Sequence, residues 1–268
     1  MVRVIDDIQE VFEFACEMSI SKKSIYPGCD SISKIRQLIQ KGIENEDDFV
    51  LGFFEEDVCQ GVFAFCHEPA DHYLELTLGF ALNKAVWKDL MNYLHEYYQK
   101  YELYVICASV NETLREVLNE ESGFFQNEQI EMQLHKPSFK ETKTLVHLIE
   151  EKDKEPYIAM HNKDGWWTGS RILEREDLFQ VYIAEDGNEI VGYLDLHVKE
   201  KVHHVFDLLV KEGHRNKGIG RALMQKAMME SQDGLSLEVD SENEIAYGLY
   251  KSLGFKDGLR KTTVIVKC

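Results

Sequence analysis

A short basic segment that contains two glycines stands out in an acidic chain. Residues 212–226 read EGHRNKGIGRALMQK, where four basic side chains surround Gly218 and Gly220 and only Glu212 opposes them. The whole chain carries 48 acidic and 30 basic residues, a formal charge of −18. Apolar residues recur at helical spacing from Ile219 onward. A basic glycine loop that opens a helix predicts an anion site, because backbone N–H groups and the helix N-terminus attract negative charge.

Three types of glycine loop could bind an anion at such a place. A dinucleotide-binding fingerprint requires Gly-x-Gly-x-x-Gly, but its sixth position is Leu223 here, which disfavours that class. A P-loop requires Gly-Lys-Ser or Gly-Lys-Thr, which this segment lacks. The remaining pattern is Arg-x-x-Gly-x-Gly, formed by Arg215, Gly218 and Gly220.

A second motif follows about 25 residues later, after a predicted helix and strand. Its pattern is Asn-x-x-Ala-x-x-x-Tyr-x-x-x-Gly-Phe, formed by Asn243, Ala246, Tyr250, Gly254 and Phe255. With these two motifs the chain resembles the GNAT superfamily of acyl-CoA N-acyltransferases. The resemblance spans about residues 178–256 and extends in weaker form to the first half. It implies an acyltransferase that uses acetyl-CoA and binds the coenzyme A pyrophosphate at the basic loop.

The resemblance also implies which residues bind acetyl-CoA. In this family the strand before the loop and the strand after its helix separate, and the pantetheine arm lies between them. The implied set combines strand backbone, loop and second helix: Leu208, Leu209, Val210, Arg215, Asn216, Lys217, Gly218, Ile219, Gly220, Arg221, Asn243, Ala246 and Tyr250.

Acetyl transfer to an amine requires a proton donor for the departing thiolate and an acceptor for the amine proton. The family assigns the donor to a tyrosine at the position of Tyr250, which is our candidate general acid. His204 and Asp207, both in the strand 203–210, are candidates for the general base, and a water chain is an equal alternative. Strand alternation does not decide between them, because a bulge in this strand would break it.

The acceptor is predicted to be a primary amine of a small molecule or a peptide. Trp166 and Trp167 lie where the family's first helices form the acceptor site, and they could provide an aromatic wall for a cationic amine. Adjacent tryptophans face different directions, so at least one is expected in the core. The sequence predicts no metal site, and it leaves the acceptor open among small amines, aminoglycosides, amino acids and protein N-termini.

Two pairs of segments indicate an internal duplication with an offset of about 130 residues. Residues 48–68 match 177–198, and residues 105–125 match 235–255. The junction is predicted at 135–143, which gives a first domain of residues 1–137 and a second of residues 138–268.

The first copy lacks the acetyl-CoA motifs. Residues 78–94 contain no Arg-x-x-Gly-x-Gly, Trp87 stands near where a glycine would be needed, and Leu118 takes the place of Tyr250. The first domain is therefore predicted to keep the fold without binding the cofactor, to pack against the second and to wall the acceptor pocket.

The predicted fold class is α/β, with two tandem GNAT-like domains that each have a mixed, mostly antiparallel sheet flanked by helices. In the second half we expect a helical segment over 143–176 that begins at TLVHLIEE, then strands near 179–184, 189–197 and 203–210. A helix over 219–231, a strand over 235–240, a helix over 243–252 and a final strand over 261–267 complete this half.

Composition sets the remaining expectations. Six scattered cysteines without a Cys-x-x-Cys pair suit reduced thiols, and the negative charge argues against nucleic acid and anionic membranes. No apolar run approaches a membrane span and the N-terminus does not resemble a signal peptide, so the sequence predicts a cytoplasmic protein, monomeric or homodimeric. A non-catalytic acyl-CoA sensor is the alternative function, although a sensor would not need the proton donor Tyr250.

Overall fold

The computed structural model describes residues 1–21, 24–29, 31–135, 137, 144–161, 167–187, 189–198, 201–231 and 233–268. The chain divides into two compact units. The first contains Met1–Gln129 and Leu259–Cys268, and the second contains Ile130–Gly258. The predicted junction 135–143 lies mostly outside the described residues. Among the described residues, no helix has the length and apolar character needed to cross a membrane.

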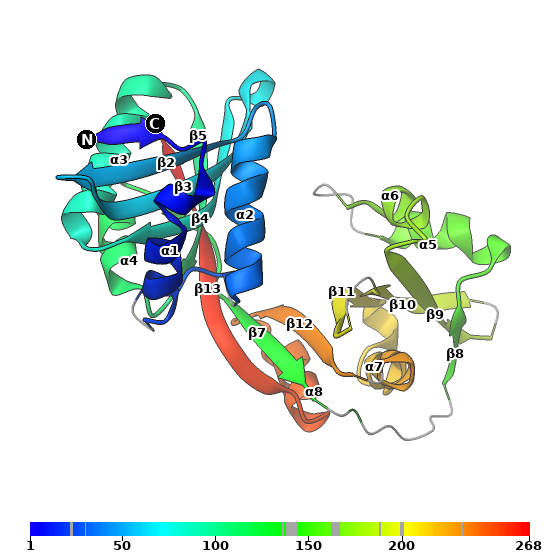
Figure 1. Cartoon of the computed structure of the whole chain (residues 1–268). Coiled ribbons are helices and arrows are strands. Elements are labelled where there is room, and N and C mark those ends of the chain that lie inside the picture. Colours follow the sequence, from blue (N-terminus) through cyan, green and yellow to red (C-terminus); the bar gives the residue numbers. More distant parts are fainter. Residues whose placement is uncertain are drawn as a thin grey trace. The chain divides into compact units, whose positions relative to one another are not determined.

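The first unit is a sheet with helices on its faces (Figure 1). The strands follow the order β1-β2-β3-β4-β5-β13, and the short β6 also pairs with β13. Among the described residues, β4 and β5 pair in parallel, and the neighbouring pairs β1-β2, β2-β3, β3-β4 and β5-β13 are antiparallel. Helices α1 and α2 contact β3 and β4, and α3 packs on the same strands and against α4. The elements are β1 (Val2–Val4), α1 (Phe12–Ser19), α2 (Ile32–Glu44), β2 (Phe49–Glu55), β3 (Val58–Glu68), β4 (Tyr73–Ala81), α3 (Lys84–Tyr97), β5 (Glu102–Ala108), α4 (Glu112–Glu120), β6 (Phe124–Phe125) and β13 (Lys256–Lys267).

The second unit has the strand order β7-β12-β11-β10-β9-β8. One side of its sheet packs on α7 and α8 around Leu194, Leu223 and Tyr250, and the other packs on α5 and α6 around Tyr157 and Tyr193. The elements are β7 (Gln129–Leu134), β8 (Leu145–Leu148), η4 (Glu151–Asp153), α5 (Lys154–Met160), α6 (Gly169–Leu173), β9 (Phe179–Asp186), β10 (Glu189–His197), β11 (His203–Val210), η5 (Glu212–His214), α7 (Ile219–Glu230), β12 (Leu235–Asp240) and α8 (Glu244–Ser252).

Strand pairing shows the same register in both halves. In the first unit Ala64 pairs with Leu78 and Phe65 with Leu76, so one residue of β4 is extra. In the second unit Asp195 pairs with Asp207 and Leu196 with Val205, so one residue of β11 is extra at the matching place. A shared bulge at one position of a shared register supports the duplication predicted from sequence.

The compact units exchange the terminal strands of the two sequence repeats. β7 closes the first repeat in sequence, but Ile130, Met132 and Leu134 are buried in the second unit's core. β13, drawn in red in Figure 1, begins in the second unit, and its residues 261–267 pair with β5 in the first. A division at 137/138 therefore follows the repeat, while each compact core contains a strand from the other repeat.

One predicted element is wrong. The segment TLVHLIEE was expected to begin a helix, but Leu145–Leu148 form strand β8, which pairs antiparallel with β9. Helix α5 begins only at Lys154, after a capping box formed by Glu150 and Asp153. The backbone pairing available at the edge of β9 outweighs the weak local helical pattern. The other predicted elements of this half lie within a few residues of the observed ones.

Candidate functional site

A groove opens in the second unit where two parallel strands separate. Residues His203–Val205 of β11 pair with Leu235–Leu237 of β12, and the pairing of these two strands ends there. On its other edge, β11 stays paired with β10 as far as Val210. The groove has a volume of about 810 Å3 and is lined by β11, the basic loop, α7, β12 and α8. Every residue assigned to acetyl-CoA in the sequence lines it except Lys217.

The bulge in β11 decides which side chains face each other. Because Phe206 is the extra residue, Val205 joins Leu208 on the side of α7 and α8, while Asp207 lies on the opposite side with Leu209. Asp207 is half-buried, lines the groove and accepts a hydrogen bond at Oδ2 from the Tyr193 hydroxyl at 2.7 Å.

His204 occupies a different environment from Asp207. Its Nδ1 lies 3.0 Å from the Ser236 hydroxyl, and it is not among the groove residues. The structure therefore brings only one of the two candidate bases, Asp207, to the groove.

The basic loop leaves the N-terminus of α7 open. Asn216 and Gly218 have positive φ values of 62° and 85°, and they turn the chain between η5 and the helix. Gly218 is the N-cap, and it has no side chain with which to bind the first N–H groups of α7. A Cβ built on Gly218 would meet no atom within 4 Å, so the space in front of these donors is open. An anion at this point would take the place of the missing cap.

The cations of the loop are held in place without being neutralised. Arg215 donates from Nε to the carbonyl of Val210 at 3.1 Å, and Arg221 donates to the Ser252 hydroxyl at 2.6 Å. Within the part of the chain that the structure describes, Arg215, Lys217 and Arg221 form no ion pair with a carboxylate. The positive potential of this loop is therefore available to a ligand.

Helix α8 brings the second motif to the same groove. Asn243 is its N-cap and accepts a hydrogen bond at Oδ1 from the Ala246 N–H at 3.1 Å. Ala246 and Tyr250 are one helical turn apart and both line the groove. Burial raises the pKa of Tyr250 to about 12, and the nearby charge of Asp207 acts in the same direction. Tyr250 is therefore a neutral proton donor near physiological pH.

The comparisons with known proteins agree with this geometry. Residues 138–255 match the Acetyltransferase (GNAT) family. These residues form a domain of the GNAT family of acetyltransferases. Enzymes of this family typically use acetyl-CoA.

A curated relative and two solved structures extend this result. An N-alpha-acetyltransferase of Sulfurisphaera tokodaii is 38% identical over 93 residues, which are 28% of this chain and 56% of the relative. The chain thus spans just over half the length of that relative. A GCN5-related N-acetyltransferase from Sphaerobacter thermophilus has a TM-score of 0.67 at 13% identity, covering 99% of this chain and 94% of that one.

The second solved structure shows the tandem arrangement. A tandem GNAT protein from the clavulanic acid biosynthesis pathway has a TM-score of 0.59 at 9% identity, covering 100% of this chain and 98% of that one. At such low identity these two likenesses concern the fold, and they show that the whole chain has the fold of tandem GNAT proteins.

The structure describes only one of the two tryptophans predicted for the acceptor site. Trp166 lies outside the described residues. Trp167 is partly buried, contacts the Phe179 ring edge-on with centroids 5.1 Å apart, and packs against the core below α5 and α6. It is not among the groove residues.

Three polar residues near the groove were missed from sequence. Tyr193 and Asp195 on β10 and His161 at the end of α5 are buried next to Asp207. The signal was present in Asp195, a carboxylate near the end of the otherwise apolar run IVGYLDL. A buried carboxylate needs polar partners from neighbouring elements, and those partners cannot be identified by sequence spacing.

Proposed function

We propose that this protein is an N-acetyltransferase that transfers an acetyl group from acetyl-CoA to a primary amine. One observation carries the proposal: the uncapped N-terminus of α7, with its basic loop, stands at the end of the groove between β11 and β12. The match to the GNAT family supports the pyrophosphate of coenzyme A as this anion.

The groove fits the parts of acetyl-CoA in order. The pyrophosphate binds the first N–H groups of α7, with Arg215, Lys217 and Arg221 supplying positive charge. The pantetheine arm lies beside Leu208–Val210, where β11 has no partner from β12, and it hydrogen-bonds to the backbone as an added strand would. The thioester then lies near Ala246, whose small side chain leaves room for it, and near Tyr250.

The chemistry follows from the residues at that end of the groove. The amine nitrogen attacks the thioester carbon, and the carbon–sulfur bond breaks as the amide forms. Tyr250 donates its hydroxyl proton to the departing thiolate, while Asp207 accepts the proton that the nitrogen loses. Return of that proton from Asp207 to the Tyr250 phenolate restores both groups. The influence of the Asp207 charge on the pKa of Tyr250 supports this pairing.

Asp207 is the better candidate for the base in this proposal. It lines the groove, and its carboxylate is fixed by Tyr193, whereas His204 is bonded to Ser236 and is not among the groove residues. A carboxylate at the acceptor end also favours a cationic amine over an anionic acceptor.

The first acceptors to test are peptide N-termini. The S. tokodaii relative is named an N-alpha-acetyltransferase, and it resembles this chain at 38% identity. A peptide panel that varies the first two residues, together with small polyamines and amino acids, separates a peptide acceptor from a small-molecule acceptor.

The test combines binding and turnover. Calorimetry with acetyl-CoA, coenzyme A and NAD should show binding of the first two alone, and the amine panel should release free thiol in the presence of acetyl-CoA. Binding without thiol release from any amine would favour the acyl-CoA sensor, and binding of NAD in place of coenzyme A would refute the proposal.

A further inference from the structure

A buried cluster of ionisable side chains lies directly behind Asp207. The Nε2 atom of His161 is 3.0 Å from Oδ2 of Asp195 and 3.9 Å from Oδ2 of Asp207. Tyr157 donates its hydroxyl to Oδ1 of Asp195 at 2.9 Å, and Tyr193 donates to Oδ2 of Asp207 at 2.7 Å. Two tyrosines and one histidine thus hold two carboxylates in fixed positions.

The cluster runs from the inside of the unit to the groove. Asp195 has no exposed surface and His161 is 4% exposed, while Asp207 is the member that lines the groove. The rings of His161 and Tyr193 stack with centroids 5.2 Å apart and an interplanar angle of 20°. This stacking fixes the plane of the imidazole, so that Nε2 points toward both carboxylates.

The fold itself does not require these polar groups. In the matching register of the first unit, Asp195 and Asp207 are replaced by the buried pair Ala64 and Leu78, and Tyr193 is replaced by Val62. Apolar side chains at these positions are therefore sufficient to form the same pair of strands. Burial of a carboxylate is unfavourable unless polar partners compensate it, so the second unit keeps a group that the fold alone gives no reason to keep. The cluster occurs in the unit that has the groove.

We propose that His161, held by Asp195 and Tyr157, is a positioning residue that orients and charge-balances the carboxylate of Asp207. This inference rests on the proposed function, in which Asp207 accepts the amine proton. When Asp207 is ionised, its Oδ2 attracts the Nε2–H of His161. When Asp207 takes up the proton, that N–H remains bound to Asp195, so His161 keeps its orientation through both states.

Several polar groups face His161 from the elements packed against it. Among the described residues, α5 presents Tyr157 to it, β10 presents Tyr193 and Asp195, and β11 presents Asp207. From α6 the apolar Gly169 approaches its Cβ. Burial raises the pKa of Asp195, while the hydrogen bonds from His161 and Tyr157 oppose that shift. The ionisation of His161 should therefore respond directly to the charge of Asp207.

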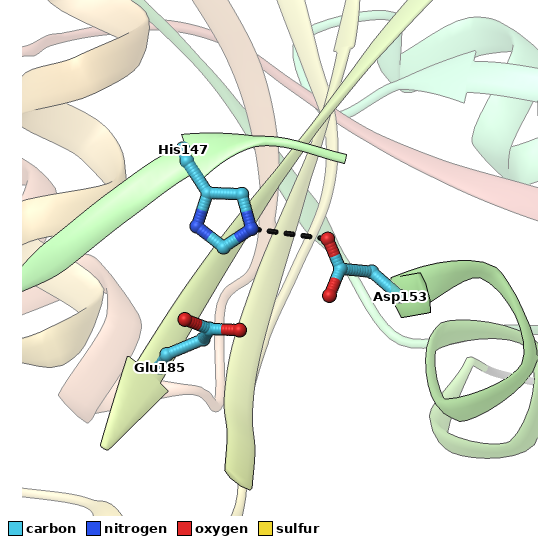
Figure 2. Close-up of side chains that lie close together, drawn as sticks. All are labelled: His147, Asp153 and Glu185. Carbon is cyan, nitrogen blue, oxygen red and sulfur yellow. Dashed lines mark hydrogen bonds and ion pairs between the residues drawn. The ribbon is translucent and has the colours of Figure 1, made fainter. Parts of the chain in front are cut away.

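The same unit contains a matched control pair. His147 on β8 lies with its Nε2 3.0 Å from Oδ2 of Asp153, and Glu185 on β9 lies nearby (Figure 2). The distance equals that between His161 and Asp195. None of these three residues is among those that line the groove, so His147 tests the effect of any histidine–aspartate pair in this unit.

The first experiment needs no turnover. Histidine side-chain NMR across pH, on the full chain, compares the wild type with Asp207→Asn. Loss of a negative neighbour should lower the titration midpoint of His161 by about one pH unit and leave that of His147 unchanged. An unchanged His161 midpoint would overturn the proposal, whatever the activity of the protein.

The second experiment asks whether His161 acts through Asp207. His161→Gln should lower kcat roughly tenfold, change the KM for acetyl-CoA less than about twofold, and shift the acid limb of the pH profile, whereas His147→Gln should do none of these. In an Asp207→Asn background the same His161→Gln change should lower kcat less than about twofold further. If His161→Gln lowered kcat by the same factor in the wild type and in Asp207→Asn, the role of His161 would be merely structural.

A metal ion is the competing explanation for this group of ligands. His161, Asp195 and Asp207 offer ligand atoms within 4.8 Å of one another. If the purified wild type contains a stoichiometric divalent ion that His161→Gln lacks, the cluster is a metal site and the proposal is wrong. Metal analysis without such an ion supports it.

Discussion

Each unit contains a parallel strand pair, and the two pairs separate at equivalent points, where the pair of the second unit borders the groove. β4 and β5 pair as far as Leu76 and Val105, and β11 and β12 pair as far as Val205 and Leu237. In the first unit the fully buried Tyr26 donates its hydroxyl to the carbonyl of Leu76 and also meets the backbone of Ile106. A side chain of the same unit thus contacts both strands where they separate, at the place equivalent to the one proposed for the pantetheine arm in the second unit.

The two helices that follow these strands begin differently. Two residues separate the end of β4 from the start of helix α3. One of them, Asn83, accepts hydrogen bonds at Oδ1 from the N–H groups of Ala85 at 2.9 Å and Val86 at 3.2 Å. Eight residues separate the end of β11 from the start of helix α7. The last of them is the N-cap Gly218, which has no side chain to cap the helix. An anion site at a helix N-terminus therefore depends as much on a missing cap as on added basic residues.

This comparison also shows the place of Trp87, which stands in the sequence near where a glycine of the loop would be needed. Its ring is buried in the core, with its centroid 5.0 Å from that of Phe63. The cap from Asn83 and the short connection are the reasons why we predict no anion site in this copy.

The largest expected effect concerns the exchanged strands. A chain cut at 137/138 should give two fragments that do not fold alone, because each loses a strand of its core. Residues 1–137 lack Val264 and Val266, and residues 138–268 lack Ile130, Met132 and Leu134. Circular dichroism and size exclusion on each fragment check this. Co-expression should restore a soluble pair, and two separately stable monomers would contradict it.

The next effect concerns binding at the uncapped helix. Gly218→Val should weaken coenzyme A binding more than roughly a hundredfold, because a β-branched residue disfavours φ of 85° and its side chain would enter the space before the N–H donors. Gly187→Val is the matched control, since Gly187 has φ of 68°, equally open space and no place in the groove.

Calorimetry on both variants and the wild type decides this prediction. The wild type should bind one coenzyme A per chain, since Asn83 and Tyr26 close the first copy. Equal weakening by both valines would mean that backbone strain alone is responsible, and two equivalent wild-type sites would refute the assignment of the first copy.

How far the sequence predicted this site depends on the kind of interaction. The loop, Asn243 and Tyr250 lie on local patterns, and all the predicted strands after residue 177 were recovered within a few residues. Asp207 was one of two candidate bases in the sequence, and its face of the strand became clear only with the bulge at Phe206. Tyr26 and His161 reach their partners across 50 and 34 residues of chain, so no local pattern could reveal them.

A smaller effect is expected at the proton donor. Tyr250→Phe should lower turnover roughly ten- to a thousandfold with little change in acetyl-CoA affinity. Tyr247→Phe, on the same helix but bonded to Asp257, is the control and should retain activity. Full activity of Tyr250→Phe would remove that residue from the mechanism.

The pH dependence of this step has a definite sign. The general acid acts in its protonated form, and the raised pKa of about 12 means that the Tyr250 phenol loses its proton only as the pH rises toward that value. Any alkaline loss of activity between pH 8 and 10 must then come from another group. A pH profile of kcat that falls in this range for the wild type and is flat for a slow Tyr250→Phe variant would contradict this.

The smallest effect tests the cap that distinguishes the first copy. Asn83→Ala should destabilise the protein by about 1 kcal/mol, because two N–H groups of α3 lose their acceptor. Asn83→Gly should cost only a few tenths of a kcal/mol and would give α3 the same N-cap residue as α7. Urea unfolding, followed by circular dichroism, measures both.

Asn83→Gly also tests whether an open helix end is sufficient for anion binding, because it would then add a second coenzyme A site. We expect no such site, because the connection remains two residues long and Tyr26 still fills the gap between β4 and β5. Calorimetry on Asn83→Gly that shows a stoichiometry above one would prove the cap to be the deciding difference between the two copies.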